Sequence, residues 1–159
     1  MANIDYERRR ISAVLLLYGP AGAGRTTVMY ALARQLPAGT HGKVSPLPQS
    51  DGRLLRLDYR PHDEELVHGF QVTFRIVSVA GEPDVEFLKG IVGAVDAVMF
   101  VADSTAGAAE ANGAARAQVE DIVRSSGRPL ASLPQVFLYN KRDVRDAVAI
   151  DTLEASLNA

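Results

Sequence analysis

Residues 19–26 have the sequence Gly-Pro-Ala-Gly-Ala-Gly-Arg-Thr, and this glycine-rich stretch decides the fold of the 159-residue chain. It follows a continuous apolar run at 13–18, which is typical of a strand buried on both faces. After the glycines, apolar residues recur at helical spacing as far as Leu36, and Pro37 ends the pattern. The sequence therefore predicts a strand, a glycine-rich loop and a helix over 26–36, in that order.

The same stretch matches the phosphate-binding loop pattern Gly-x-x-x-x-Gly-Lys-[Ser/Thr] at every fixed position except one, where Arg25 replaces the lysine. Backbone N–H groups of such a loop converge on an anion, and the dipole of the following helix adds to the attraction. Thr26 provides the hydroxyl that this pattern directs at Mg²⁺. Three interpretations stay open: a working phosphate loop, a relic that no longer binds nucleotide, or a tight connection between strand and helix.

Composition and charge argue against several other classes of protein. A net charge of -2 and a pI near 5.9 make nucleic acid an unsuitable main partner, because binding phosphates requires a basic face. The chain contains no cysteine, which excludes disulfides and thiolate metal sites. Residues 1–10 are polar, unlike a signal peptide, and the most apolar stretch, 91–102, is too short to span a membrane and contains Asp96. We therefore expect a cytoplasmic protein.

The rest of the chain alternates between strand and helix patterns. Residues 37–52 are rich in proline and glycine and predict a long loop, of the kind that is usually functional or mobile. The remaining predicted elements are strands at 54–59, 70–79, 95–101 and 134–139, and helices at 106–125 and 151–157, the last capped by Asp151. No repeat or internal linker interrupts them, so residues 1–159 predict one α/β domain with a mostly parallel sheet.

A second motif, Asn140-Lys141-Arg142-Asp143, follows the last predicted strand. A carboxylate such as that of Asp143 can accept hydrogen bonds from N1–H and the 2-amino group of guanine, and adenine has no matching pair of donors. We expect Asn140 to tie this turn to the phosphate loop and the Lys141 stem to lie along the base. The alternative is a polar turn after a strand. Here the turn follows an apolar strand and lies far downstream of a phosphate-loop pattern, with the intervening elements in order. This arrangement favours a guanine-nucleotide site over a simple polar turn.

Taken together, these motifs resemble the Ras-like small GTPases, and more closely the bacterial gliding-motility and polarity GTPases of the MglA type. The matching segments are Ile4-Asp5-Tyr6, Tyr18-Gly19-Pro20, Thr26-Thr27, Gly69-Phe70, Phe100-Val101-Ala102-Asp103-Ser104, Glu110-Ala111-Asn112 and Tyr139-Asn140-Lys141-Arg142-Asp143. The resemblance implies a P-loop G domain with helices on both faces of the sheet and a switch controlled by GTP, GDP and Mg²⁺. It also implies a dimeric roadblock-type activator as partner and an output in cell polarity or motility.

Several positions depart from the pattern of this family. Arg25 keeps the charge of the lysine but is longer, planar and forked. Arg53 matches a candidate catalytic arginine, whereas Leu54 stands where a threonine senses the γ-phosphate through Mg²⁺. Ser78 occupies the aspartate position of Asp-x-x-Gly and can support the metal only weakly. Glu82 replaces the glutamine that orients water; its carboxylate could act as a base, but it adds negative charge near phosphate.

The resemblance further implies a strand, a guanine-bracing loop and a closing helix beyond Ala159, so we expect a C-terminally shortened G domain without the last strand and helix of the family. The leading interpretation is a guanine-nucleotide-binding protein with slow or partner-dependent GTP hydrolysis. A pseudo-GTPase that serves as an interaction module is the alternative, and another P-loop ATPase or kinase is a lesser one. The residues of the leading interpretation are Gly19, Gly22, Gly24, Arg25, Thr26 and Thr27 for phosphate and Mg²⁺, Asn140, Lys141 and Asp143 for guanine, and Arg53 and Glu82 for catalysis.

Overall fold

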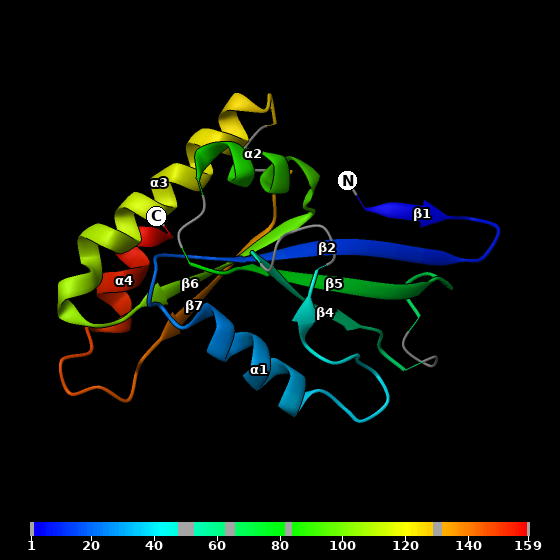
Figure 1. The fold of residues 1–159 in the computed structure, drawn as a ribbon, viewed down its shortest axis with the longest axis horizontal. Coiled ribbons are helices and arrows are strands. Elements are labelled where there is room, and N and C mark those ends of the chain that lie inside the picture. Colours follow the sequence, from blue (N-terminus) through cyan, green and yellow to red (C-terminus); the bar gives the residue numbers. More distant parts are fainter. Residues whose placement is uncertain (1, 48–52, 63–65, 82–83, 129–131, 159) are drawn as a thin grey trace.

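A central β-sheet with helices packed on both of its faces forms the framework of the protein (Figure 1). The computed structural model describes residues 2–47, 53–62, 66–81, 84–128 and 132–158. The elements are β1 (Asn3–Asp5), β2 (Arg10–Tyr18), α1 (Arg25–Gln35), β3 (Ser45–Pro46), β4 (Leu54–Tyr59), β5 (Gln71–Val79), α2 (Val85–Ala94), β6 (Ala97–Asp103), the 3₁₀ turn η1 (Ala106–Ala108), α3 (Ala109–Ser125), β7 (Gln135–Asn140) and α4 (Ile150–Leu157).

The order of the strands places the glycine-rich loop at the centre of the sheet. The strands follow the order β3-β4-β5-β2-β6-β7, and β1 pairs with β2 beside this path. Strand β2 is parallel to both β5 and β6, and β6 is parallel to β7, whereas β1, β3 and β4 pair antiparallel. The predicted α/β fold with a mostly parallel sheet is confirmed. Because α1, which follows β2, and α2, which connects β5 to β6, cover opposite faces of the sheet, the loop after β2 lies where open α/β sheets bind ligands.

Two hydrophobic clusters hold the helices against the sheet. On one face, α1 packs Val28 and Met29 against Leu17 of β2 and Val101 of β6. On the other face, α2, α3 and α4 contribute buried side chains to a larger cluster around Phe100. The clusters hold α1 and β6 in place against the sheet. Because α1 follows the glycine-rich loop and β6 contacts it, this packing also positions the loop.

Helix α2 was not expected from the sequence. Its buried side chains, Leu88 and Val92, have helical spacing, and the Asp84 side chain accepts a hydrogen bond from the N–H of Phe87 at the start of the helix. The Gly-Glu-Pro break at 81–83 and the apolar stretch at 91–102 hid this short helix in front of β6. Strand β1 and the two-residue β3 inside the predicted 37–52 loop were also missed, because such short strands depend on their pairing partners.

The prediction that Asp151 caps the last helix is wrong. Ala149 is the N-cap of α4, and no side-chain hydrogen bond to that cap is found among the described residues. Asp151 lies inside the first turn, where its negative charge faces the positive end of the helix dipole instead. The predicted helix over 106–125 divides into η1 and α3, which are continuous in the chain.

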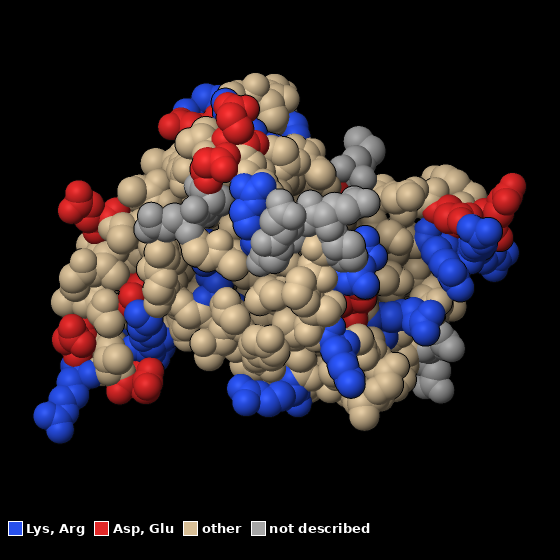
Figure 2. All heavy atoms as spheres, viewed as in Figure 1, with Lys and Arg blue, Asp and Glu red and all other residues tan. Residues whose placement is uncertain are grey.

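Within the described part of the chain, no helix is long and apolar enough to cross a membrane. On the face shown in Figure 2, basic and acidic side chains are interspersed. They meet at the end of the molecule formed by the β1–β2 turn, where Arg8 is paired with Asp5.

Candidate functional site

The glycine-rich loop follows β2 and wraps around the start of α1, and two of its glycines are required by close contacts. A Cβ atom on Gly19 would lie 2.1 Å from the carbonyl oxygen of Val101, which leaves no room for any side chain. Gly24 has φ +90°, and a Cβ there would lie 2.4 Å from Nδ2 of Asn140. The loop is therefore held tightly against β6 on one side and against the end of β7 on the other.

The N-terminus of α1 can accept an anion. Its N-cap is Gly24, no side-chain hydrogen bond caps it among the described residues, and its first turn contains no acidic residue. The backbone N–H groups of the first turn can therefore donate to a ligand. A cavity of about 200 Å³ opens beside this terminus and is lined by Ala21, Gly22, Gly24, Arg25, Thr26, Val79 and Gly81. Thr26 and Thr27 are both exposed in the first turn of the helix.

Arg25 is buried at this position, with only 6% of its surface exposed. Its Nη2 donates a hydrogen bond to the carbonyl oxygen of Gly81 over 2.5 Å, and its guanidinium carbon lies 5.8 Å from the centre of the Tyr18 ring. The positive charge expected from the sequence is therefore present at the glycine-rich loop. Its hydrogen bond reaches the segment that follows β5.

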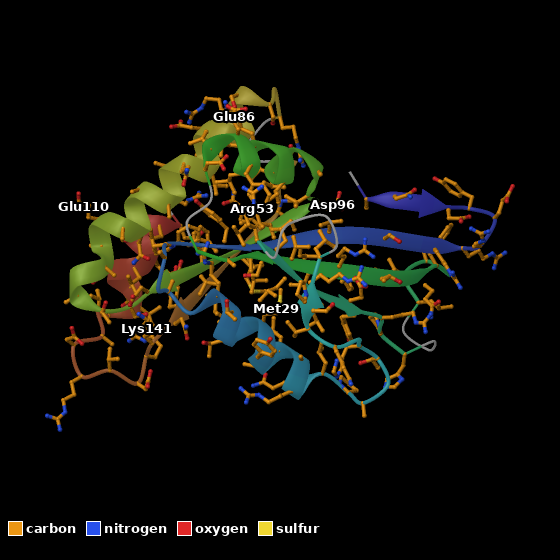
Figure 3. All side chains as sticks on the ribbon, in the orientation of Figure 1. Met29, Arg53, Glu86, Asp96, Glu110 and Lys141 are labelled. Atoms are coloured by element: carbon orange, nitrogen blue, oxygen red, sulfur yellow. The ribbon has the colours of Figure 1, made fainter. Side chains whose placement is uncertain are left out.

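The Asn140–Asp143 turn is joined directly to the glycine-rich loop. Nδ2 of Asn140, the last residue of β7, donates a hydrogen bond to the carbonyl oxygen of Ala23 over 2.8 Å. This is the contact between the two loops that the sequence predicts. Lys141 follows with a left-handed φ of 60°, and Asp143 is exposed. In Figure 3, Lys141 lies on the loop that leads from β7 towards α4. The geometry brings the predicted phosphate and base residues to one end of the sheet.

Asp103, the last residue of β6, contacts the Asn140–Asp143 turn through Lys141. Its Oδ2 pairs with Nζ of Lys141 over 2.6 Å, and its Oδ1 accepts a hydrogen bond from the backbone N–H of Thr105. Burial raises the pKa of Asp103, but the hydrogen bonds from Lys141 and Thr105 outweigh it and lower the pKa below the usual value of 3.8. The carboxylate is therefore held in its charged form beside the lysine.

Asn112 of α3 fixes Asp103 through two further hydrogen bonds. Its Oδ1 accepts from the backbone N–H of Asp103 over 3.0 Å, and its Nδ2 donates to the carbonyl oxygen of Asp103 over 2.8 Å. Asn112 is 1% exposed. Both residues belong to segments that carry the family resemblance, but the sequence analysis assigned neither of them a role in the site. Two features of the sequence could have indicated their roles: Asp103 is a polar residue at the end of an apolar strand, and Asn112 is a polar residue inside an alanine-rich helix.

Comparison with known proteins assigns the chain to a family. No protein-family model matches it. It is 32% identical over 159 residues to the mutual gliding-motility protein MglA of Myxococcus xanthus (strain DK1622), and the match covers 99% of this chain and 82% of that protein. The chain belongs to the MglA family of Ras-like small GTPases. This confirms the resemblance stated from the sequence motifs.

The positions that the sequence analysis assigned to the first switch contact α2 and the hydrophobic core. The guanidinium of Arg53 lies 3.8 Å from the centre of the Phe87 ring, and it pairs with Asp84 over 3.4 Å. Arg53 is therefore held at the start of α2, and its label lies close to this helix in Figure 3. Its neighbour Leu54 is 8% exposed and pairs with Val79 in the sheet, where it packs into the core.

Ser78 lies on β5 beside Leu17, and only 1% of its surface is exposed. Its hydroxyl has no hydrogen-bond partner in the described part of the structure. It lies on the face of the sheet that α1 covers, because it shares that face with Ile76. Glu82, the other candidate at this switch, lies outside the described residues.

Proposed function

We propose that this chain is a cytoplasmic switch protein that binds GTP and GDP and hydrolyses GTP slowly or only with a partner. The observation that carries the proposal is the hydrogen bond from Asn140 to Ala23, which joins a guanine-type turn to a phosphate-type loop. This hydrogen bond brings together two motifs that lie 117 residues apart in the sequence, as a shared nucleotide site requires.

On the phosphate side, Gly19, Gly22 and Gly24 shape the loop, and Arg25 supplies the charge. The uncapped N-terminus of α1 and the adjacent cavity fit the phosphates of a nucleotide. Thr26 and Thr27 are exposed in the first turn, and Thr26 would hold Mg²⁺, which neutralises charge on the phosphate oxygens when it is bound.

On the base side, Asp143 would accept the two donors of guanine, and Lys141 would support the base. The structure fits these roles in two respects. Asp143 is exposed and thus accessible to a ligand, and Lys141 is oriented by its ion pair with Asp103. Because this ion pair holds the ammonium group, less side-chain freedom remains to be lost when the base binds.

Hydrolysis should be slow without help. Loss of a single group that stabilises a charged transition state typically costs about 10²–10³ in rate, and Ras-like proteins start near ~10⁻⁴ s⁻¹ unaided. Leu54 has no oxygen to offer, and the Ser78 hydroxyl is a weaker metal support than a carboxylate. Arg53 and Glu82 are the proposed catalytic groups, and Arg53 is bound to α2 in this structure.

Membership of the MglA family supports a partner-dependent activity, with a roadblock-type dimeric activator as the proposed partner and bacterial cell polarity or motility as the proposed setting. The contacts of Arg53 suggest how a partner could act. An activator that shifts the start of α2 would move Phe87 and Asp84, and with them the guanidinium that stacks on one and pairs with the other.

A second candidate function is a pseudo-GTPase that serves as a protein-interaction module. The specific observation in its favour is that Leu54 is packed into the core and that the Ser78 hydroxyl is buried. A protein that cannot sense the γ-phosphate would present the same surface with GTP as with GDP. Equal affinity for the two nucleotides, together with identical conformations, would support this function against the first.

The deciding experiment measures nucleotide in the purified protein. The protein is denatured, the precipitate is removed, and the released nucleotide is identified by ion-exchange chromatography. Close to one equivalent of GDP or GTP supports the proposal, and competition with ATP tests the choice of base. A protein that carries no nucleotide and does not bind added GTP with Mg²⁺ would refute it. An Arg25→Lys variant that then bound GTP would identify the arginine as the cause.

A further inference from the structure

Strand β7 forms one border of the sheet, and its hydrogen bonds to β6 show which of its backbone groups face inwards. The N–H of Val98 donates to the carbonyl oxygen of Pro134 over 2.9 Å. At the other end of the strand pair, the N–H of Ser104 donates to the carbonyl oxygen of Asn140 over 3.1 Å. Because backbone groups alternate in direction along a strand, the even-numbered residues of β7 face β6 and the odd-numbered ones face outwards.

The free side of β7 therefore presents the N–H and C=O groups of Gln135, Phe137 and Tyr139. Strand β7 pairs only with β6 within the described ranges, and no backbone hydrogen bond to these groups is found there. An unpaired row of this kind is a template for pairing with another strand.

The composition of β7 does nothing to prevent such pairing. Exposed edge strands are usually protected by charged side chains, proline or a bulge, whereas residues 135–140 contain no charged residue and no proline. Four of these residues, at 136–139, are apolar, yet none of the six is buried. Val136 is 57% exposed, although it lies in the middle of the apolar run. The strand thus combines an open backbone edge with an apolar side chain left in solvent.

The sequence of β7 is complementary to itself in the antiparallel direction. If a two-fold axis passes beside Phe137, the Phe137 residues of two copies lie opposite each other, and Gln135 of one copy lies opposite Tyr139 of the other. All the outward N–H and C=O groups of both strands then find partners. The same register places Val136 opposite Leu138, which covers the exposed Val136 side chain, and no like charges meet.

We propose that β7 is a dimerisation edge, which pairs antiparallel with β7 of a second copy of this chain in the register centred on Phe137. The two sheets then join into one. Because the paired strands run in opposite directions, the two Asn140–Asp143 turns lie at opposite ends of the strand pair. The inference does not depend on the proposed function, since no nucleotide takes part in the contact.

Sedimentation velocity of the 159-residue protein over a concentration series tests the association. The wild type should approach twice the monomer mass as concentration rises. Val136→Lys places a charge beside Leu138 of the second copy twice in each dimer, so it should weaken association on the order of tenfold. Val67→Lys is the matched control, because Val67 is 49% exposed on a turn before β5, away from β7. Equal urea midpoints for the two variants would show that the fold is intact.

Disulfide cross-linking tests the register, because the chain has no cysteine of its own. Val136→Cys and Leu138→Cys proteins are mixed and mildly oxidised. The mixture should form a disulfide-linked dimer, because side chains directly opposite each other have Cβ atoms about 4.5–5.5 Å apart, close to disulfide geometry. Each variant alone should form far less, and Val67→Cys measures cross-linking by chance collision. If Leu138→Cys lowers the urea midpoint, the comparison of the lysine variants decides the proposal.

Three results would overturn the proposal. A wild-type protein that keeps the monomer mass at every concentration forms no such dimer. Association that Val136→Lys and Val67→Lys weaken to the same degree does not use β7. Val136→Cys protein that cross-links to itself as efficiently as the mixture does pairs in a different register, since Val136 would then lie opposite its own copy.

Discussion

Replacing Asn112 with alanine tests how far this side chain stabilises Asp103 and, through it, the Asn140–Asp143 turn. The side chain is 1% exposed, and its two hydrogen bonds satisfy both the N–H and the C=O of Asp103. A lost hydrogen bond costs about 0.5–1.5 kcal/mol net, and a buried backbone group left without a partner costs about 1–3 kcal/mol. Two such groups would be affected, so we expect the free energy of unfolding to fall by about 2–4 kcal/mol.

Urea denaturation at pH 7 measures this loss as a lower midpoint with an unchanged slope. Asn158→Ala is the matched control, because Asn158 is exposed and donates its side-chain hydrogen bond to Glu154 at the surface; its effect should stay within about 0.5 kcal/mol. The Asn112→Ala variant should also bind GDP several-fold more weakly, because Asn112 fixes Asp103 and Asp103 pairs with Lys141. An Asn112→Ala protein as stable as the control would refute the reasoning that this network holds the turn.

Further predictions concern the base, the loop and pH. Asp143→Asn should weaken GDP binding on the order of a hundredfold in a titration, because two hydrogen bonds to guanine are lost or reversed; Asp146→Asn, on the same exposed loop, should leave it unchanged. Gly19→Ala should cost more than about 3 kcal/mol in urea denaturation, since its Cβ would meet the Val101 carbonyl at 2.1 Å; normal stability would contradict the tight loop. The lowered pKa of Asp103 stabilises the fold above its unfolded pKa of 3.8, and this contribution should disappear as pH falls through the lower folded pKa. Asp103→Asn should remove that part of the acid dependence.

Local patterns were sufficient to predict the centre of the fold. A buried strand, a glycine-rich loop and a helix in sequence leave few alternatives, and the turn after β7 is a short motif whose residues are adjacent in the chain. The contact between Asn140 and Ala23 was also predictable, because the carboxyl ends of parallel strands meet at one edge of the sheet. These predictions depend on residues that are close together in the sequence or placed by parallel pairing.

The directions of the arginine side chains could not be predicted in this way. Arg53 is held by Phe87 and Asp84, which belong to a helix that the apolar stretch at 91–102 concealed. Arg25 is directed towards Gly81 by the packing of β5 beside β2, which is a tertiary contact between residues 56 positions apart. The sequence analysis could name both arginines as charges for phosphate, but the partners of Arg53 belong to a helix that it did not contain, and the partner of Arg25 depends on how two predicted strands pack together.

These two arginines contact residues at opposite ends of the segment that joins β5 to α2. Arg25 contacts Gly81 at the beginning of that segment, and Arg53 contacts Asp84 and Phe87 at its end. A nucleotide that contacts Arg25 and a partner that contacts α2 would therefore bind near the two ends of this segment. Any coupling free energy between the two ligands must be reciprocal: a partner that binds α2 more tightly with GDP present must strengthen GDP binding by the same factor.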